Sequence, residues 1–104
     1  MSTFDDRQKA YENKLAHDQE LDFKVRSRAN IFLARWAAER MHFEGSDIDA
    51  YATNVIDYSI SNSGDDAVIS KILTDIRTKG FEIDEKEIKN QLDLFLIEAR
   101  ESFK

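Results

Sequence analysis

The sequence predicts an all-α protein, because three features favour helix over strand. The 104 residues contain no proline and only three glycines, so few positions interrupt a helix. Ala, Leu, Glu, Lys and Arg, which have high helix propensity, are abundant. Large apolar residues recur at steps of three and four along most of the chain, which is the spacing of one helix face. Together these features predict a four-helix bundle with an additional N-terminal segment that is helical or partly disordered.

Length and composition limit the class of protein further. A chain of 104 residues suits one domain with a modest core. The absence of cysteine excludes disulfides and thiolate metal sites and fits a reducing compartment. No apolar run reaches the roughly 18 to 20 residues that span a bilayer, and the first ten residues lack the pattern of a secretory signal. We therefore expect a cytoplasmic protein without direct membrane insertion.

The charge of the chain argues against one class of partner. The formal net charge is -6, with acidic and basic residues spread along the chain. Phosphate backbones would repel such a surface on average. We therefore expect no nucleic acid partner.

The longest apolar stripe predicts the first bundle helix, over about residues 21–43. Its apolar positions are Ala29, Phe32, Leu33, Trp36, Ala37 and Met41. We expect Gly45 to end this helix in a left-handed conformation, and Ser46 to cap the next helix with Asp49 three residues further on. A lone tryptophan at this spacing is typical of a core, so we assign Trp36 to packing and not to ligand stacking.

Three further stripes predict three further helices, over about residues 46–60, 65–79 and 84–103. Turn-forming residues, including three glycines in the whole chain, separate the stripes. In the last helix we expect Asp84 to act as the N-cap and Glu87 to reach back and complete a capping box. The connections of two to six residues that this scheme leaves are typical of a compact helical bundle.

The chain therefore divides into a segment of residues 1–19 and a bundle of residues 20–104. Thr3 with Asp6 gives the segment a box-like helix start, and acidic residues lie where the helix dipole favours them. The segment should be helical when something supports it.

Three apolar residues, Phe4, Tyr11 and Leu15, fall along one face of this segment. Full burial of each side chain would contribute at most about 1.5 to 3 kcal/mol. Fixing a dozen backbones costs about 1 to 2 kcal/mol apiece, and short isolated helices are marginal in water. The segment is thus either an accessory helix that caps the bundle or a helix that binds a groove on a partner, and these arguments favour neither.

Residues that could carry chemistry are few and scattered. Two histidines, no cysteine nucleophile and three isolated glycines match no catalytic triad and no phosphate-binding loop. His17 lies near Asp18, Glu20 and Asp22, but these residues fall on different sides of a helix and match no zinc motif. We therefore expect no catalytic residues, no metal site and no cofactor.

A group of arginines provides an alternative function. The group consists of Arg26, Arg28, Arg35 and Arg40. Guanidinium groups suit phosphate geometry, so these residues could make the chain a stand-alone helical binding module for a small anionic ligand such as a nucleotide. Pairing with carboxylates such as Glu39 and Glu44 is the commoner fate of such residues, and we favour it.

Three motifs in residues 3–41 carry a resemblance to a known family. They are "FDDR" with Lys9 and Ala10 behind it, "AHDQEL" followed by Phe23 and Lys24, and "WAAER". In this order and spacing they closely resemble the N-terminal half of the zeta subunit of the alphaproteobacterial F-type ATP synthase. Beyond residue 45 the similarity is weaker and rests mainly on "AYA" and "GDD".

The resemblance implies a function for the opening segment. Members of this family are four-helix bundles whose N-terminal segment inhibits ATP hydrolysis by the F1 sector, entering the interface between the alpha and beta subunits beside gamma. It implies a regulatory subunit, a monomer when free, that is peripheral on the membrane-bound synthase. Together with the apolar spacing, it predicts partner-binding residues at Thr3, Phe4, Asp5, Asp6, Arg7, Lys9, Ala10, Tyr11, Lys14 and Leu15.

Overall fold

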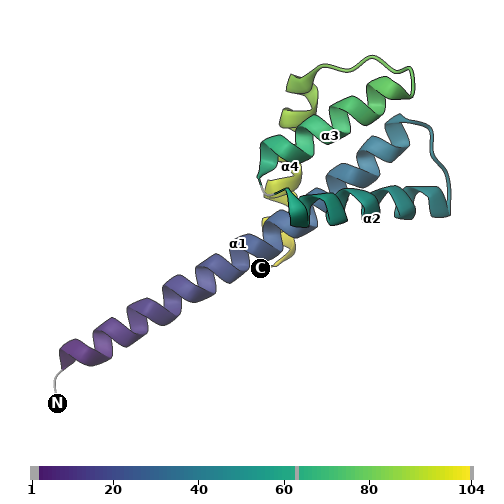
Figure 1. The fold of residues 1–104 in the computed structure, drawn as a ribbon. Helices are drawn as coiled ribbons and strands as arrows, with labels where there is room; N and C mark the ends of the chain where they lie inside the picture. The colour runs from purple at the N-terminus through teal and green to yellow at the C-terminus, as the bar shows by residue number, and fades with distance from the viewer. Residues whose placement is uncertain (1–2, 63, 104) are drawn as a thin grey trace.

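The structure of the protein, a computed structural model, consists of four helices. It describes the backbone of residues 3–62 and 64–103, and the side chains of residues 19–62 and 64–103. The helices are α1 (Thr3–Arg40), α2 (Ser46–Ser61), α3 (Asp65–Thr78) and α4 (Glu85–Ser102). Within these residues there is no strand, so the all-α fold class is confirmed (Figure 1).

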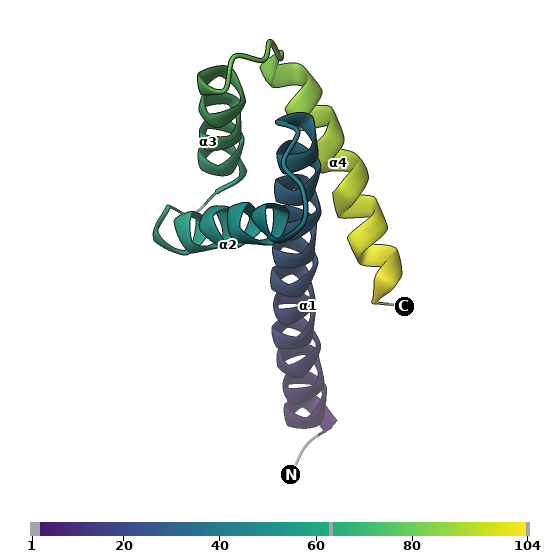
Figure 2. The same cartoon turned by 90° about the vertical axis from the view of Figure 1, so that its right-hand side faces the viewer.

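Helix α1 is the central helix of the bundle. It packs against all three other helices, whereas α2 and α4 do not contact each other. These two helices lie on opposite sides of α1 (Figure 2). Helix α3 closes the bundle by packing against both α2 and α4. In two perpendicular views the C-terminal half of α1 lies inside the bundle, and its N-terminal half projects beyond the other helices (Figures 1 and 2). The molecule therefore measures 66 × 24 × 24 Å.

The core consists of apolar side chains from all four helices. The largest fully buried ones are Leu33, Ile72, Ile76, Ile88, Val25, Val55 and Val68. The stripe predicted for the first bundle helix is confirmed, because its aliphatic positions are buried and Phe32 and Trp36 are partly buried against the same cluster. Trp36 thus packs on the core, as predicted. Among the described side chains no polar or charged residue is buried.

The start of α1 differs from the prediction. A bundle helix beginning near Leu21 was expected, but α1 is continuous from Thr3 to Arg40. No glycine or proline occurs between these two residues, so nothing in the sequence breaks the helix. The backbone is therefore unbroken at residue 19, where the two parts of the chain were expected to meet.

The end of α1 is also different, and the reason is local. His42 has a left-handed conformation, with φ of 63°. The amide of Phe43 donates to the carbonyl oxygen of Ala38 at 2.9 Å. The amide of His42 donates to the carbonyl oxygen of Glu39 at 3.0 Å. These two bonds form a Schellman motif, which ends the helix before Gly45 is reached. The prediction that Gly45 ends the helix was therefore wrong.

The other helix boundaries lie close to those predicted. Gly80, with φ of 92°, follows the end of α3 in the conformation that glycine favours. The side chain of Asp84 caps α4 by accepting a hydrogen bond from the Lys86 amide at 3.2 Å, as expected. Two other cap predictions were wrong. Gly45 and not Ser46 occupies the cap position of α2, and the Glu87 carboxylate pairs with Arg40 instead of completing a box.

Candidate functional site

The projecting part of α1 is the candidate functional site. All ten predicted partner-binding residues lie on its first thirteen residues, from Thr3 to Leu15, and the backbone there is helical. At 1.5 Å per residue this stretch is about 20 Å long. The side chains of these residues, with the predicted capping by Thr3 and Asp6, lie outside the part of the chain whose side chains are described. What the structure contributes is the position of the backbone, away from the other helices (Figure 1).

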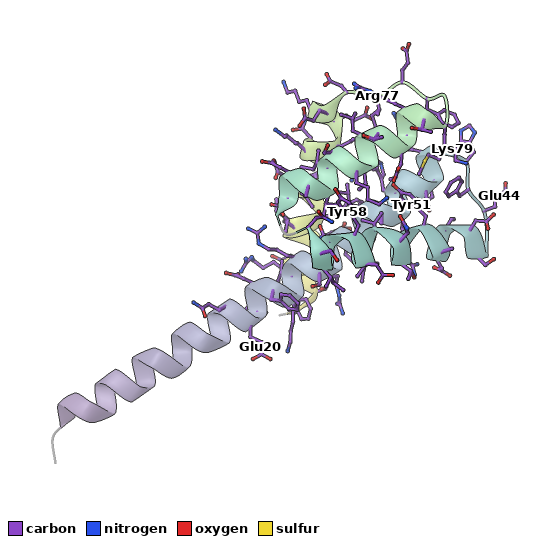
Figure 3. The ribbon with its side chains drawn as sticks, in the orientation of Figure 1. Glu20, Glu44, Tyr51, Tyr58, Arg77 and Lys79 are labelled. Carbon is purple, nitrogen blue, oxygen red and sulfur yellow. The ribbon has the colours of Figure 1, made fainter. Side chains whose placement is uncertain are left out.

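Packing against the bundle begins a few turns further along α1. Among the described side chains, Val25 is the first that is fully buried, and Leu21 is partly buried against the core. The residues just before them are exposed, and Glu20 lies on α1 at the edge of the bundle (Figure 3). Burial therefore holds α1 from about Leu21 onward.

Polar contacts surround α1 where it enters the bundle. Asp22 accepts from Arg100 of α4 at 3.0 Å, and Arg26 donates to Asp65 of α3 at 2.9 Å. Arg28 donates to the Ser102 hydroxyl at 2.9 Å. We call these three contacts the collar. They join α1 to the start of α3 and the end of α4.

The contacts of the collar contribute little to the free energy of folding. The side chains of its two ion pairs are exposed by 38 to 59%, and exposed ion pairs contribute only about 0.2 to 1 kcal/mol each. Burial of Val25 and Ala29 beneath the collar is the larger contribution. The contacts on two sides of α1 nevertheless favour one rotation of the helix about its axis. The projecting segment is part of the same helix, so these contacts also determine which of its faces points in which direction.

The four arginines do not form an anion site. Arg26 pairs with Asp65, Arg35 with Asp49 at 3.0 Å, and Arg40 with Glu87 at 3.3 Å. Pairing with carboxylates was the favoured interpretation, but the partners lie on other helices and are not the expected Glu39 and Glu44. The reason is that α1 packs against its neighbours along this whole stretch.

Arg28 contacts the C-terminal end of α4. Its guanidinium carbon lies 4.5 Å from the centre of the Phe103 ring, in addition to the bond to Ser102. The contact is a cation–π interaction at the end of α4. The four guanidinium groups thus bind different partners around the bundle and do not converge on one ligand.

Two neighbouring hollows of the described surface are acidic. One of about 770 Å³ is lined by Glu82, Asp84 and Glu87 besides Arg77 and apolar residues of the α3–α4 connection. The neighbouring one, of about 440 Å³, has Glu39 and Glu82 beside Arg40, Trp36, His42 and Phe81. Carboxylates repel a phosphate, so these hollows do not support a nucleotide site.

A polar network that sequence reasoning missed holds α2 to α3. The hydroxyl of Tyr51, which Figure 3 labels on α2, donates to the Asp75 carboxylate at 2.9 Å. The Lys71 ammonium group donates to the same carboxylate oxygen at 3.1 Å. Burial raises the pKa of Tyr51 well above its usual value, and the hydrogen bond to Asp75 and its negative charge raise it further. The four-residue step from Lys71 to Asp75 is visible in the sequence, but the contact with Tyr51 depends on how the helices pack.

No group of three or more His, Asp or Glu side chains among residues 19–62 and 64–103 is placed to hold a metal ion. None of the helices in the described part of the chain is long and apolar enough to cross a membrane.

A comparison with protein families identifies the chain. The family described as ATPase inhibitor subunit zeta matches residues 1–102. The chain belongs to this family. The match covers the bundle as well as the projecting segment, so the zeta resemblance of residues 3–41 extends over nearly the whole sequence. No curated protein matches the chain.

Membership of the zeta family has two consequences. It supports an inhibitory, regulatory role without catalysis, and it implies interaction with F1-ATPase.

Proposed function

We propose that the chain inhibits ATP hydrolysis by F1-ATPase with its N-terminal segment, residues 1–19. In this proposal the segment enters the interface between the alpha and beta subunits beside gamma, and residues 20–104 are the scaffold that presents it. The observation that carries the proposal is the N-terminal half of α1, which projects from a bundle of the zeta inhibitor family. The protein acts as a monomer on the cytoplasmic side of the membrane-bound synthase.

The inhibition is mechanical and needs no chemistry from the zeta chain. A catalytic interface has to open and close during turnover. A helix of about 20 Å wedged into that interface keeps it from closing or opening. Phe4, Tyr11 and Leu15 supply apolar contact, and the charged residues between them set the register of the helix through charge complementarity. The residues that contact F1 are Thr3, Phe4, Asp5, Asp6, Arg7, Lys9, Ala10, Tyr11, Lys14 and Leu15.

The continuity of α1 lowers the free-energy cost of binding. An isolated segment would first have to nucleate a helix, which is the unfavourable step of helix formation. Here the buried turns after Leu21 already form the nucleus, and the helix only has to extend toward Thr3. A preorganised segment loses less conformational entropy when the partner binds it.

The test is an ATP hydrolysis assay with F1 from the same source as the zeta chain. The full chain should inhibit hydrolysis in a concentration-dependent manner. A variant that lacks residues 1–14 should not inhibit, while circular dichroism shows that its bundle remains helical. Full inhibition by the shortened chain would show that the contacts with F1 lie elsewhere.

A further inference from the structure

We propose that the bundle carries a second contact surface for F1, a groove around Phe23 and Ile60. This inference rests on the proposed function of the N-terminal segment. The groove lies between α1, the C-terminal end of α2 and the start of α3, and its volume is about 540 Å³. We call it the Phe23–Ile60 groove.

The groove has the composition of a protein-binding surface. Phe23 and Ile60 are 71% and 77% exposed, the highest values of any large apolar side chain in the described part of the chain. Val68 and Ile56 lie in the same groove, and Asn30 and other polar residues also line it. An apolar centre with a hydrogen-bonding rim is typical of protein interfaces, and exposed apolar patches often mark them. The fold itself gains little from leaving these two side chains in water.

The position of the groove points to F1 as its partner. Phe23 follows Leu15 by eight residues of one unbroken helix, which is about 12 Å. Tyr11, Leu15, Gln19 and Phe23 stand at steps of four residues, so their positions form one ridge that winds about 40° around α1 at each step. A partner that covers Tyr11 and Leu15 and follows this winding ridge about 12 Å further along α1 meets the groove. The second surface is therefore continuous with the proposed first one.

The charges around the groove define the chemistry of the partner. Arg26 and Asp65, which line it, neutralise each other through a contact of 2.9 Å. The groove thus offers no free charge to a ligand, and an apolar occupant fits it better than an ionic one. The occupant is an apolar-faced segment of an alpha or beta subunit at the mouth of the crevice that receives residues 1–19.

Site-specific crosslinking tests this placement. The chain has no cysteine, so Ile60→Cys introduces a single thiol that can carry a photoactivated crosslinker. Ile97→Cys is the matched control, since Ile97 is 64% exposed and lies on α4, on the other side of α1. With F1 under hydrolysis conditions, Ile60→Cys should give crosslinks to alpha or beta at least tenfold more often than the control. Equal yields, or crosslinks mainly between two zeta chains, would overturn the proposal.

A titration measures how much the groove contributes to binding. Ile60→Ser should raise the concentration needed for half-maximal inhibition about tenfold, the effect expected from losing one apolar side chain at an interface. Maximal inhibition should stay unchanged, and Ile97→Ser should behave like the unmodified chain. If the unmodified chain inhibits but Ile60→Ser inhibits equally well, the groove proposal is wrong and the proposed function stands. If the unmodified chain does not inhibit, the proposed function itself is wrong.

Discussion

Replacing Glu20 by proline would separate the two halves of α1 without touching the core. Glu20 is exposed and lies just before the first side chains that pack on the bundle. Proline at this position removes the backbone hydrogen bond to residue 16 and clashes with that carbonyl group. It also disfavours a helical conformation at Gln19, whereas it suits the first residue of the helix that follows. The bundle should therefore start a new helix at residue 20. The segment before it should no longer be continuous with a helix that is already formed.

The size of the effect follows from helix nucleation. A segment detached from α1 has to nucleate its own helix. The nucleation constant is about 10⁻³, which corresponds to a free-energy cost of at most about 4 kcal/mol. We therefore expect Glu20→Pro to bind F1 between about tenfold and a thousandfold more weakly. Glu20→Ala is the control, because both variants lose the exposed Glu20–Lys24 pair of 3.5 Å. That pair contributes only about 0.2 to 0.5 kcal/mol.

Two measurements check this prediction. The half-inhibitory concentration in F1 hydrolysis gives the loss of affinity for each variant. Circular dichroism of the free chain should lose up to about a fifth of its helical signal in Glu20→Pro, since 17 helical residues precede Glu20. Urea unfolding should give nearly the same bundle stability for both variants. Equal inhibition by Glu20→Pro and Glu20→Ala would refute the reasoning that continuity of α1 assists binding.

Other predictions concern the scaffold. Leu33→Ala should lower the free energy of unfolding in urea by about 2 to 5 kcal/mol, because Leu33 is fully buried, whereas Ile97→Ala should change it by less than about 0.5 kcal/mol. The raised pKa of Tyr51 means that the folded protein holds this proton more tightly than the unfolded chain, so its contribution is complete below about pH 10 and is lost as the pH rises further. Tyr51→Phe should therefore show a shallower loss of stability above pH 10, and an unchanged slope would contradict this assignment. Arg26→Gln should cost less than about 1 kcal/mol, and 1 M NaCl should reduce that difference, which a large salt-independent loss would contradict.

Most of the bundle could be predicted because its signals are local. The apolar stripes of α3 and α4 repeat at helical spacing, and their ends are marked by residues with a defined preference, such as Gly80 and Asp84. Burial of Leu33 follows from the same spacing on α1. These features depend on a few neighbouring residues, so they can be recognised without knowing the fold.

Features that depend on tertiary packing could not be predicted. The partner of Arg26 is 39 residues away, and that of Arg100 is 78 residues away. The end of α1 was missed because a histidine, His42, adopts the left-handed conformation that glycine usually takes. The exposure of Ile60 depends on how α2 crosses α1, although its apolar spacing alone is typical of a core residue.

The helical state of the opening segment was predictable, but its connection to the bundle was not. The apolar residues of the opening segment are too few to define a stripe that joins the next one, so a break near Leu21 was expected. The absence of glycine and proline between Thr3 and Arg40 was the signal for one continuous helix. The residues proposed to contact F1 came from the family resemblance and the apolar spacing.

The central claim is that the bundle is stable without the segment that it presents. Thermal unfolding of a chain lacking residues 1–14, compared with the full chain, tests this claim most directly. Among the side chains that the structure describes, those of residues 19–62 and 64–103, the first buried in the core is Val25. The midpoint should therefore shift by less than about 3 °C, which corresponds to less than about 0.5 kcal/mol for a domain of this size. A loss of more than about 10 °C, or a shortened chain that does not fold, would contradict the account.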